Sequence, residues 1–151
     1  MAHAMHPADT TAPAPANAWS SVAARPAAQA WAVLYVGFAV LPIVAGLDKF
    51  CHVLVNWDLY LAPLVTQILP IEGHTFMLVV GVIEIAAGVV VALRPQIGAY
   101  IVMLWLWGII VNLLLTPAGF YDIALRDFGL SLGALALARL SQEFDPRPLG
   151  I

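Results

Sequence analysis

A single carboxylate interrupts the apolar stretch that runs from Thr75 to Leu93 and reads TFMLVVGVIEIAAGVVVAL. About 20 consecutive apolar residues cross the hydrocarbon core of a bilayer as an α-helix. The stretch therefore predicts a membrane-spanning helix, and Glu84 lies near the middle of its length. A charged carboxylate at that depth is costly unless it is paired, protonated or turned toward a wet cavity.

The composition of the whole chain agrees with a membrane location. Of the 151 residues, 62% are hydrophobic and only 10% are charged, whereas about a quarter of the residues in a soluble domain are charged. The Lys and Arg residues are isolated from one another, so nucleic acid is not an expected partner. The single cysteine, Cys51, excludes an intrachain disulfide, a CxxC redox pair and covalent haem attachment through CxxCH. We therefore expect this apolar chain to have the lipid bilayer as its partner.

Three further apolar stretches extend the prediction to one all-α membrane domain over residues 28–140. The predicted spans cover about residues 28–47, 75–93, 97–115 and 120–140. Short Pro- and Gly-containing turns separate the last three spans, and such turns join antiparallel neighbours in an up-down four-helix bundle. The Ala- and Pro-rich residues 1–27 are predicted to be a disordered tail, and residues 141–151 a polar tail.

The segment between the first two spans has a different character. Residues 56–69 mix apolar and polar side chains, and Trp57 and Tyr60 are of the kind that favours the headgroup level. Pro63 and the frequent polar residues argue against a fifth span. We expect an additional amphipathic helix that either lies in the interface or dips into the bundle.

The basic residues predict the orientation of the bundle. Those on the side of the two termini outnumber those on the opposite side: Arg25, Arg94, Arg139 and Arg147 against Lys49 and Arg126. Cytoplasmic loops carry the excess of Lys and Arg. Both termini are therefore predicted to be cytoplasmic.

Polar residues inside the predicted spans are the candidate ligand or proton site. Glu84 either carries a proton or binds a ligand, or it is a protonated carboxyl that holds helices together. Lys49 ends the first span and Asp127 lies about two turns into the fourth, so either a Lys49–Glu84 or a Lys49–Asp127 ion pair can form. Asn112 lies in the outer third of the third span and either joins this cluster or bonds across helices. The alternative is that the charged residues sit among headgroups and water.

Glycines mark two candidate packing surfaces. Gly81 and Gly88 flank Glu84 about one turn to either side. They permit either close helix packing or space for a flat ligand. Gly129 and Gly133 form a G-x-x-x-G pair on the fourth span, which serves packing within the bundle or a contact in a homo-oligomer.

Two histidines and two tryptophans complete the list of candidates. His52 and His74 lie near the outer ends of the first two spans, where paired imidazoles can hold a metal or a haem iron. Spacing alone is weak evidence, so we interpret them as solvated interface residues and predict no metal site. Trp105 and Trp107 lie mid-span on separate faces, and either could stack against a quinone ring, although packing explains them equally well.

Two short motifs resemble the DoxX-like family of small four-span bacterial membrane proteins. Residues 46–50, GLDKF, are similar to the family's G-x-x-K-φ signature, and residues 81–88, GVIEIAAG, are similar to its E-x-x-x-G second span. The resemblance covers about residues 30–140. It implies a location in the bacterial inner membrane and an association with membrane redox systems, among them thiosulfate:quinone oxidoreductase.

These observations lead to a functional expectation with two alternatives. We expect an accessory, non-catalytic subunit of a respiratory or other redox complex that contacts a quinone or a proton path through Glu84, without a covalently bound cofactor. The alternatives are a proton or small-solute transporter and a structural anchor for a partner membrane protein. The sequence lacks a nucleophile elbow, a P-loop and a dinucleotide fingerprint, so no catalytic residue is predicted.

Overall fold

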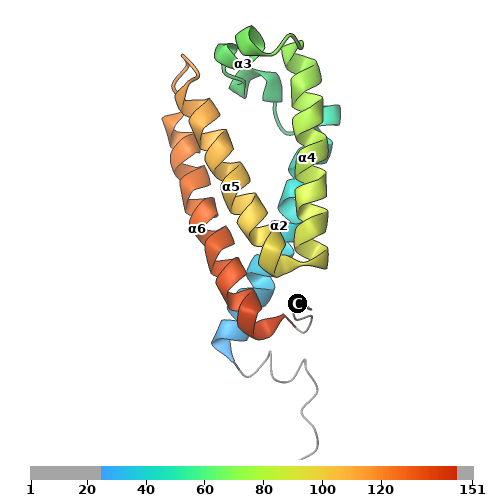
Figure 1. Cartoon of the computed structure of the whole chain (residues 1–151), viewed down its shortest axis with the longest axis vertical. Coiled ribbons are helices and arrows are strands. Elements are labelled where there is room, and N and C mark those ends of the chain that lie inside the picture. The colour runs from blue at the N-terminus through green and yellow to red at the C-terminus, as the bar shows by residue number, and fades with distance from the viewer. Residues whose placement is uncertain (1–24, 146–151) are drawn as a thin grey trace, which may run out of the picture.

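The computed structural model describes residues 25–145, and within them the chain forms an all-α bundle (Figure 1). The long helices are α2 (Pro26–Cys51), α4 (Gly73–Leu93), α5 (Pro95–Leu114) and α6 (Tyr121–Phe144). They agree with the predicted spans to within a few residues at each end. Most of the predicted N-terminal tail lies outside the described residues, as do residues 146–151.

The first helix is longer than the sequence predicts. Pro26 and its neighbour, assigned to the tail, already form the first turn of α2, because proline is well suited to the first helical position. At the other end the helix continues through Asp48 and Lys49 instead of stopping at them. Both side chains are buried, and each has a polar partner inside the protein. Because the two charges are already compensated, the helix does not have to end where they would first reach water. Helix α6 is also longer than predicted: it continues to Phe144 and so includes the first residues of the predicted C-terminal tail.

Three of the helices are long and apolar enough to cross a membrane, namely α2, α4 and α5. Their outward faces carry large apolar side chains such as Val36, which is 58% exposed, and Leu104, which is 66% exposed. These features make the chain a multi-pass membrane protein. Helix α6 has 24 residues and packs along α5, but its charged residues set it apart from the other three.

The helices pack as two pairs. Helix α2 lies along α4, and α5 lies along α6, while the contact between the pairs is looser. Small and branched residues close the bundle near the termini, where Ala87, Val91, Ala134 and Leu137 form the core. The pairs separate toward the α3 end of the molecule (Figure 1).

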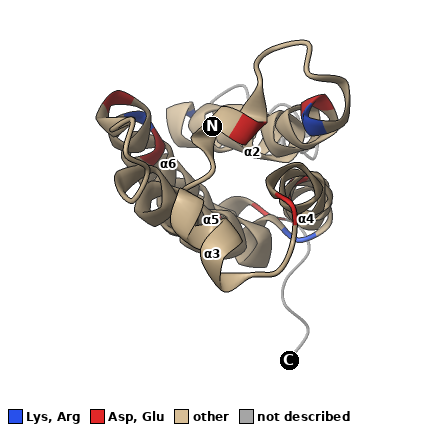
Figure 2. Ribbon diagram, turned by 90° about the horizontal axis from the view of Figure 1, so that it is seen from above, with Lys and Arg blue, Asp and Glu red and all other residues tan. Residues whose placement is uncertain are grey.

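The segment between α2 and α4 covers this end of the bundle (Figure 2). The single amphipathic helix that we expected over residues 56–69 is divided into a 3₁₀ helix, η1 (Trp57–Tyr60), and a six-residue helix, α3 (Pro63–Ile68). Pro63 starts a new helix because proline favours the first helical position. Asn112 of α5 fixes the break, since its side chain accepts from the Ala62 N–H at 3.0 Å and donates to the Tyr60 carbonyl at 2.7 Å.

Candidate functional site: a buried ion pair beside an apolar cavity

Lys49 of α2 and Glu84 of α4 form a buried ion pair. The Lys49 Nζ donates to Glu84 Oε2 at 2.5 Å, and the two side chains are 3% and 10% exposed. Of the two pairings that the sequence left open for Lys49, the structure contains this one. Each charge in the pair therefore compensates the other in a region of low dielectric constant.

Two glycines, Gly46 and Gly81, allow α2 and α4 to come close enough for this ion pair to form. A Cβ at Gly46 would lie 2.5 Å from the Gly81 carbonyl oxygen, and a Cβ at Gly81 would lie 2.7 Å from the Gly46 oxygen. The backbones of α2 and α4 thus touch at this crossing, and Gly81 lies directly against the Lys49 side chain. Gly88 packs against α2 in the same way, at Ala39 and Ile43. Helix α2 occupies the space that a flat ligand would need beside these glycines.

Asp48 and Trp57 surround the ion pair on the loop side. The Lys49 Nζ lies 3.8 Å from the centroid of the Trp57 ring, a cation–π contact. The Trp57 indole N–H donates to Asp48 Oδ2 at 2.7 Å. Asp48 also accepts from the backbone N–H groups of Val53 and Leu54, each at 3.0 Å from Oδ1. Asp48 therefore holds Trp57 over the Lys49 ammonium group.

Sequence reasoning missed both of these residues. The sequence placed Trp57 at the headgroup level and gave Asp48 no role beyond its place in the GLDKF motif. The available signal was the direct adjacency of Asp48 and Lys49 at the end of an apolar helix, where two opposite charges need separate partners.

An apolar cavity of about 910 Å³ adjoins the pair. Its walls come from all four long helices and from the segment over residues 54–65, and they are mostly aliphatic and aromatic. The side chains with polar atoms that line it are Lys49, Trp57, Tyr60, Glu84, Trp105, Asn112, Arg126 and Asp127. The arrangement combines an apolar volume with a small polar region, as in many ligand pockets.

Asp127 faces the same cavity but has a different partner. It is 5% exposed, and its Oδ1 accepts from the Arg126 Nε at 3.2 Å. The Arg126 side chain is 65% exposed, so its charge lies near the outer surface. The candidate site thus holds a Lys49–Glu84 pair and an Arg126–Asp127 pair on different helices. Asn112 also lines the cavity, with both ends of its amide bonded to the covering segment.

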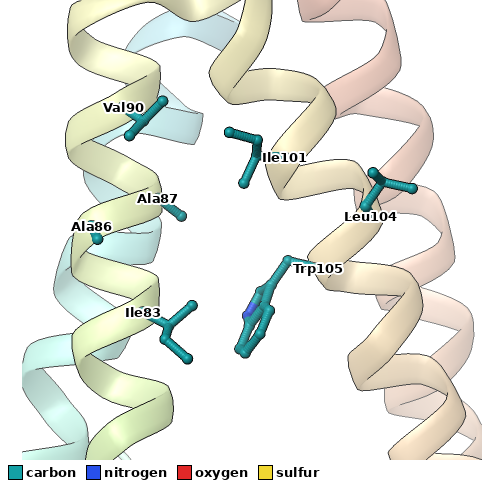
Figure 3. A pocket seen from close by; sticks show the side chains of 7 residues that line it. All are labelled: Ile83, Ala86, Ala87, Val90, Ile101, Leu104 and Trp105. Carbon is teal, nitrogen blue, oxygen red and sulfur yellow. The ribbon is translucent and has the colours of Figure 1, made fainter.

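Trp105 separates this cavity from a second hollow on the outside of the bundle. That groove, of about 440 Å³, lies between α4 and α5 and is lined by apolar side chains (Figure 3). Trp105 and Ala87 line both spaces. The Trp105 indole N–H is buried and makes no hydrogen bond with the described residues. Trp107 lies on another face and contacts the Phe128 ring edge-on at 5.8 Å.

The glycine pair on α6 does not bring two backbones together in this chain. A Cβ at Gly133 would meet the Phe38 ring at 3.2 Å. A Cβ at Gly129 would have no neighbour within 4 Å among the residues the structure describes. The proposed homo-oligomer contact of this stripe stays a prediction.

The two candidate histidines lie side by side at the α3 end. The His52 and His74 rings stack with their centroids 5.5 Å apart. The His74 Nδ1 lies 3.0 Å from Asp58 Oδ2. Asp58 was not among the residues that the sequence singled out, because nothing in its spacing connects it to either histidine.

No protein-family model, curated protein or solved structure matches this chain. The DoxX-like resemblance therefore rests on the two short motifs alone.

Proposed function

We propose that this chain is a four-span protein of the bacterial inner membrane that binds a quinone-like ligand in its cavity as an accessory subunit of a redox complex. The observation that carries the proposal is the buried Lys49–Glu84 pair on the wall of an apolar cavity of about 910 Å³. Such a volume suits an aromatic headgroup with part of an apolar tail.

The charge pair suits the polar part of a quinone. A quinone carbonyl needs a hydrogen-bond donor, and Lys49 has further N–H groups besides the one that it donates to Glu84. Reduction of a quinone also consumes protons, and a carboxyl in the same cavity can hold or release one. The electrons would come from the redox partner. Trp57 and Trp105 add aromatic surfaces on which the ring could stack.

The four-span topology requires α6 to cross the bilayer despite its charges. At about 1.5 Å per residue, its 24 residues are long enough to do so. Asp127 faces the cavity, and the long Arg126 side chain can extend toward the headgroups. Neither charge then has to contact lipid tails. The DoxX-like resemblance and the basic-residue count support the same topology, with both termini cytoplasmic.

Ligand binding is tested with the purified full-length protein in mild detergent. We expect decylubiquinone to quench tryptophan fluorescence saturably, since Trp57 and Trp105 line the cavity. The double variant K49M/E84Q removes the Lys49 donor without leaving a buried charge unpaired, and it should weaken binding by about tenfold or more, the equivalent of a hydrogen bond to a charged group. The matched control is Tyr35→Phe, which removes a partly buried α2–α4 hydrogen bond outside the cavity. Non-saturable quenching, or equal affinities in wild type and K49M/E84Q, would refute the quinone site.

The accessory role is tested separately by copurification. A stoichiometric oxidoreductase subunit, identified by mass spectrometry after mild-detergent purification, supports membership of a redox complex. A non-redox membrane partner that remains bound to the E84Q variant would instead favour a structural anchor. Purification without a partner, together with proton flux into proteoliposomes that E84Q abolishes, would favour a transporter.

A further inference from the structure

Three potential metal ligands converge where α2, η1 and α4 meet. They are His52 just after α2, Asp58 in η1 and His74 in the first turn of α4. One ligand atom from each lies within 4.8 Å of those from the other two. The three residues come from separate segments, so their proximity is not a consequence of helical spacing. They lie outside the cavity and its lining.

The backbone at His52 is unusual for a histidine. The residue adopts the left-handed conformation, with φ 53° and ψ 39°, and its N–H donates to the Asp48 carbonyl at 2.7 Å. Helix ends of this type normally use glycine or asparagine, which adopt this conformation with little strain. The requirements of the helix end therefore do not explain a histidine here.

One oxygen of the Asp58 carboxylate has no hydrogen-bond partner among the described residues. Its Oδ2 contacts His74, whereas Oδ1 is buried and makes no hydrogen bond within residues 25–145. Buried polar atoms nearly always have a partner, and an unsatisfied one calls for an explanation such as an ion. A cation bound between Asp58 and the two imidazoles would supply it.

We propose that His52, Asp58 and His74 form a site for a divalent transition-metal ion, with Zn²⁺ as the best match. Two imidazoles and one carboxylate suit zinc and its neighbours rather than Mg²⁺ or Ca²⁺, which take oxygen ligands. A tetrahedral zinc ion with bonds of about 2.1 Å needs its ligand atoms about 3.4 Å apart. Side-chain rotation closes the present separation, since the His74 and Asp58 side chains are 48% and 35% exposed. A water molecule would take the fourth position.

The site would cross-link the covering segment to the bundle. The ion would join the end of α2 and the start of α4 to η1. Trp57, which lies over Lys49, is in η1 next to Asp58. Metal binding would thus stabilise the segment that closes the cavity, whatever ligand the cavity takes.

The test is Zn²⁺ titration of the full-length protein after removal of metal with a chelator. We expect one ion per chain by calorimetry, a cobalt-substituted form with absorption bands of a four-coordinate site, and a higher Tm with Zn²⁺ present. The double variant H52Q/H74Q should lose the cobalt spectrum. The single variant D58N should bind Zn²⁺ more than tenfold more weakly. Loss of a residue that only hydrogen-bonds to a metal ligand already lowers metal affinity by about tenfold or more.

Matched variants separate this site from other histidines and from folding defects. H3Q/H6Q removes the same number of histidines from the N-terminal region and should keep the wild-type affinity and spectrum. H52G removes a ligand but suits the left-handed backbone, so it should fold at least as well as wild type without metal and still lose the spectrum. Binding without one-to-one stoichiometry, or binding that H3Q/H6Q abolishes and H52G retains, overturns the proposal.

Discussion

Gly46 and Gly81 meet backbone to backbone where α2 crosses α4, and Lys49 packs against Gly81 at this crossing. The ion pair with Glu84 depends on this approach, because a wider separation of the helices would leave the two charges apart in an apolar region. The stability of the bundle and the geometry of the candidate site therefore share one structural cause.

Replacing Gly46 by Ala should destabilise the protein. The new Cβ would lie 2.5 Å from the Gly81 oxygen and 2.8 Å from Ile85 Cγ1, so backbone must move. Overpacking of this kind costs about 1–3 kcal/mol, more than the gain of about 1 kcal/mol from replacing a helical glycine by alanine. Thermal unfolding in detergent measures the change. Gly129→Ala is the control, since its Cβ would meet nothing within 4 Å, and it should leave Tm unchanged or raise it.

Removing one member of the ion pair should be much worse than removing both. Lys49→Met leaves the Glu84 carboxyl buried without its partner, and Glu84→Gln does the same to Lys49. Breaking a buried pair costs about 3–5 kcal/mol, whereas replacing both members by neutral residues is often nearly neutral. The double variant K49M/E84Q should therefore unfold closer to wild type than the single variant K49M does.

A double-mutant cycle in detergent, by denaturant unfolding, measures this coupling. Glu143→Gln serves as the comparison, because that side chain is exposed and takes no part in the pair, so the free energy of unfolding should change by about 0.5 kcal/mol or less. Additive effects of K49M and E84Q would show that the two residues do not form a stabilising pair in the folded protein.

Much of the helical architecture could be predicted from hydropathy, because the apolar runs of α2, α4 and α5 are long enough to span a bilayer and are bounded by Pro, Gly or charged residues. The ends of α2 and α6 could not, since burial of Asp48 and Lys49 depends on partners from other segments. The prediction of a single helix over residues 56–69 was wrong for a similar reason. Their break at Pro63 is held by Asn112, which is more than forty residues away in the sequence.

The candidate site was only partly predictable. Glu84 stands out because a lone carboxylate in an apolar run needs an explanation, and Lys49 was an evident partner. Trp57 and Asp58 act through contacts between segments that no local pattern encodes, whereas the signal for Asp48 was its adjacency to Lys49.

Replacing Asn112 by Leu should loosen the segment that covers the cavity. The substitution removes the acceptor for the Ala62 N–H and the donor to the Tyr60 carbonyl. Each lost hydrogen bond costs about 1 kcal/mol, and more where a buried partner stays unsatisfied. Hydrogen exchange should therefore accelerate over residues 57–62 but not within α6. Thr66→Ala, which removes an exposed hydrogen bond to Pro63 in the same segment, should change exchange there much less.

The lone cysteine provides a direct test of the proposed orientation. Cys51 is exposed and lies at the end of α2 near the covering segment, opposite the ends that carry both termini. With both termini cytoplasmic, a membrane-impermeant maleimide should label Cys51 in intact spheroplasts without permeabilisation. The control places the cysteine at the other end, as Gln142→Cys in a Cys51→Ser background, and should be labelled only after the membrane is opened. The reverse labelling pattern would mean that both termini lie outside and that the covering segment faces the cytoplasm. Protection of both positions would contradict exposure of Cys51 to the aqueous phase.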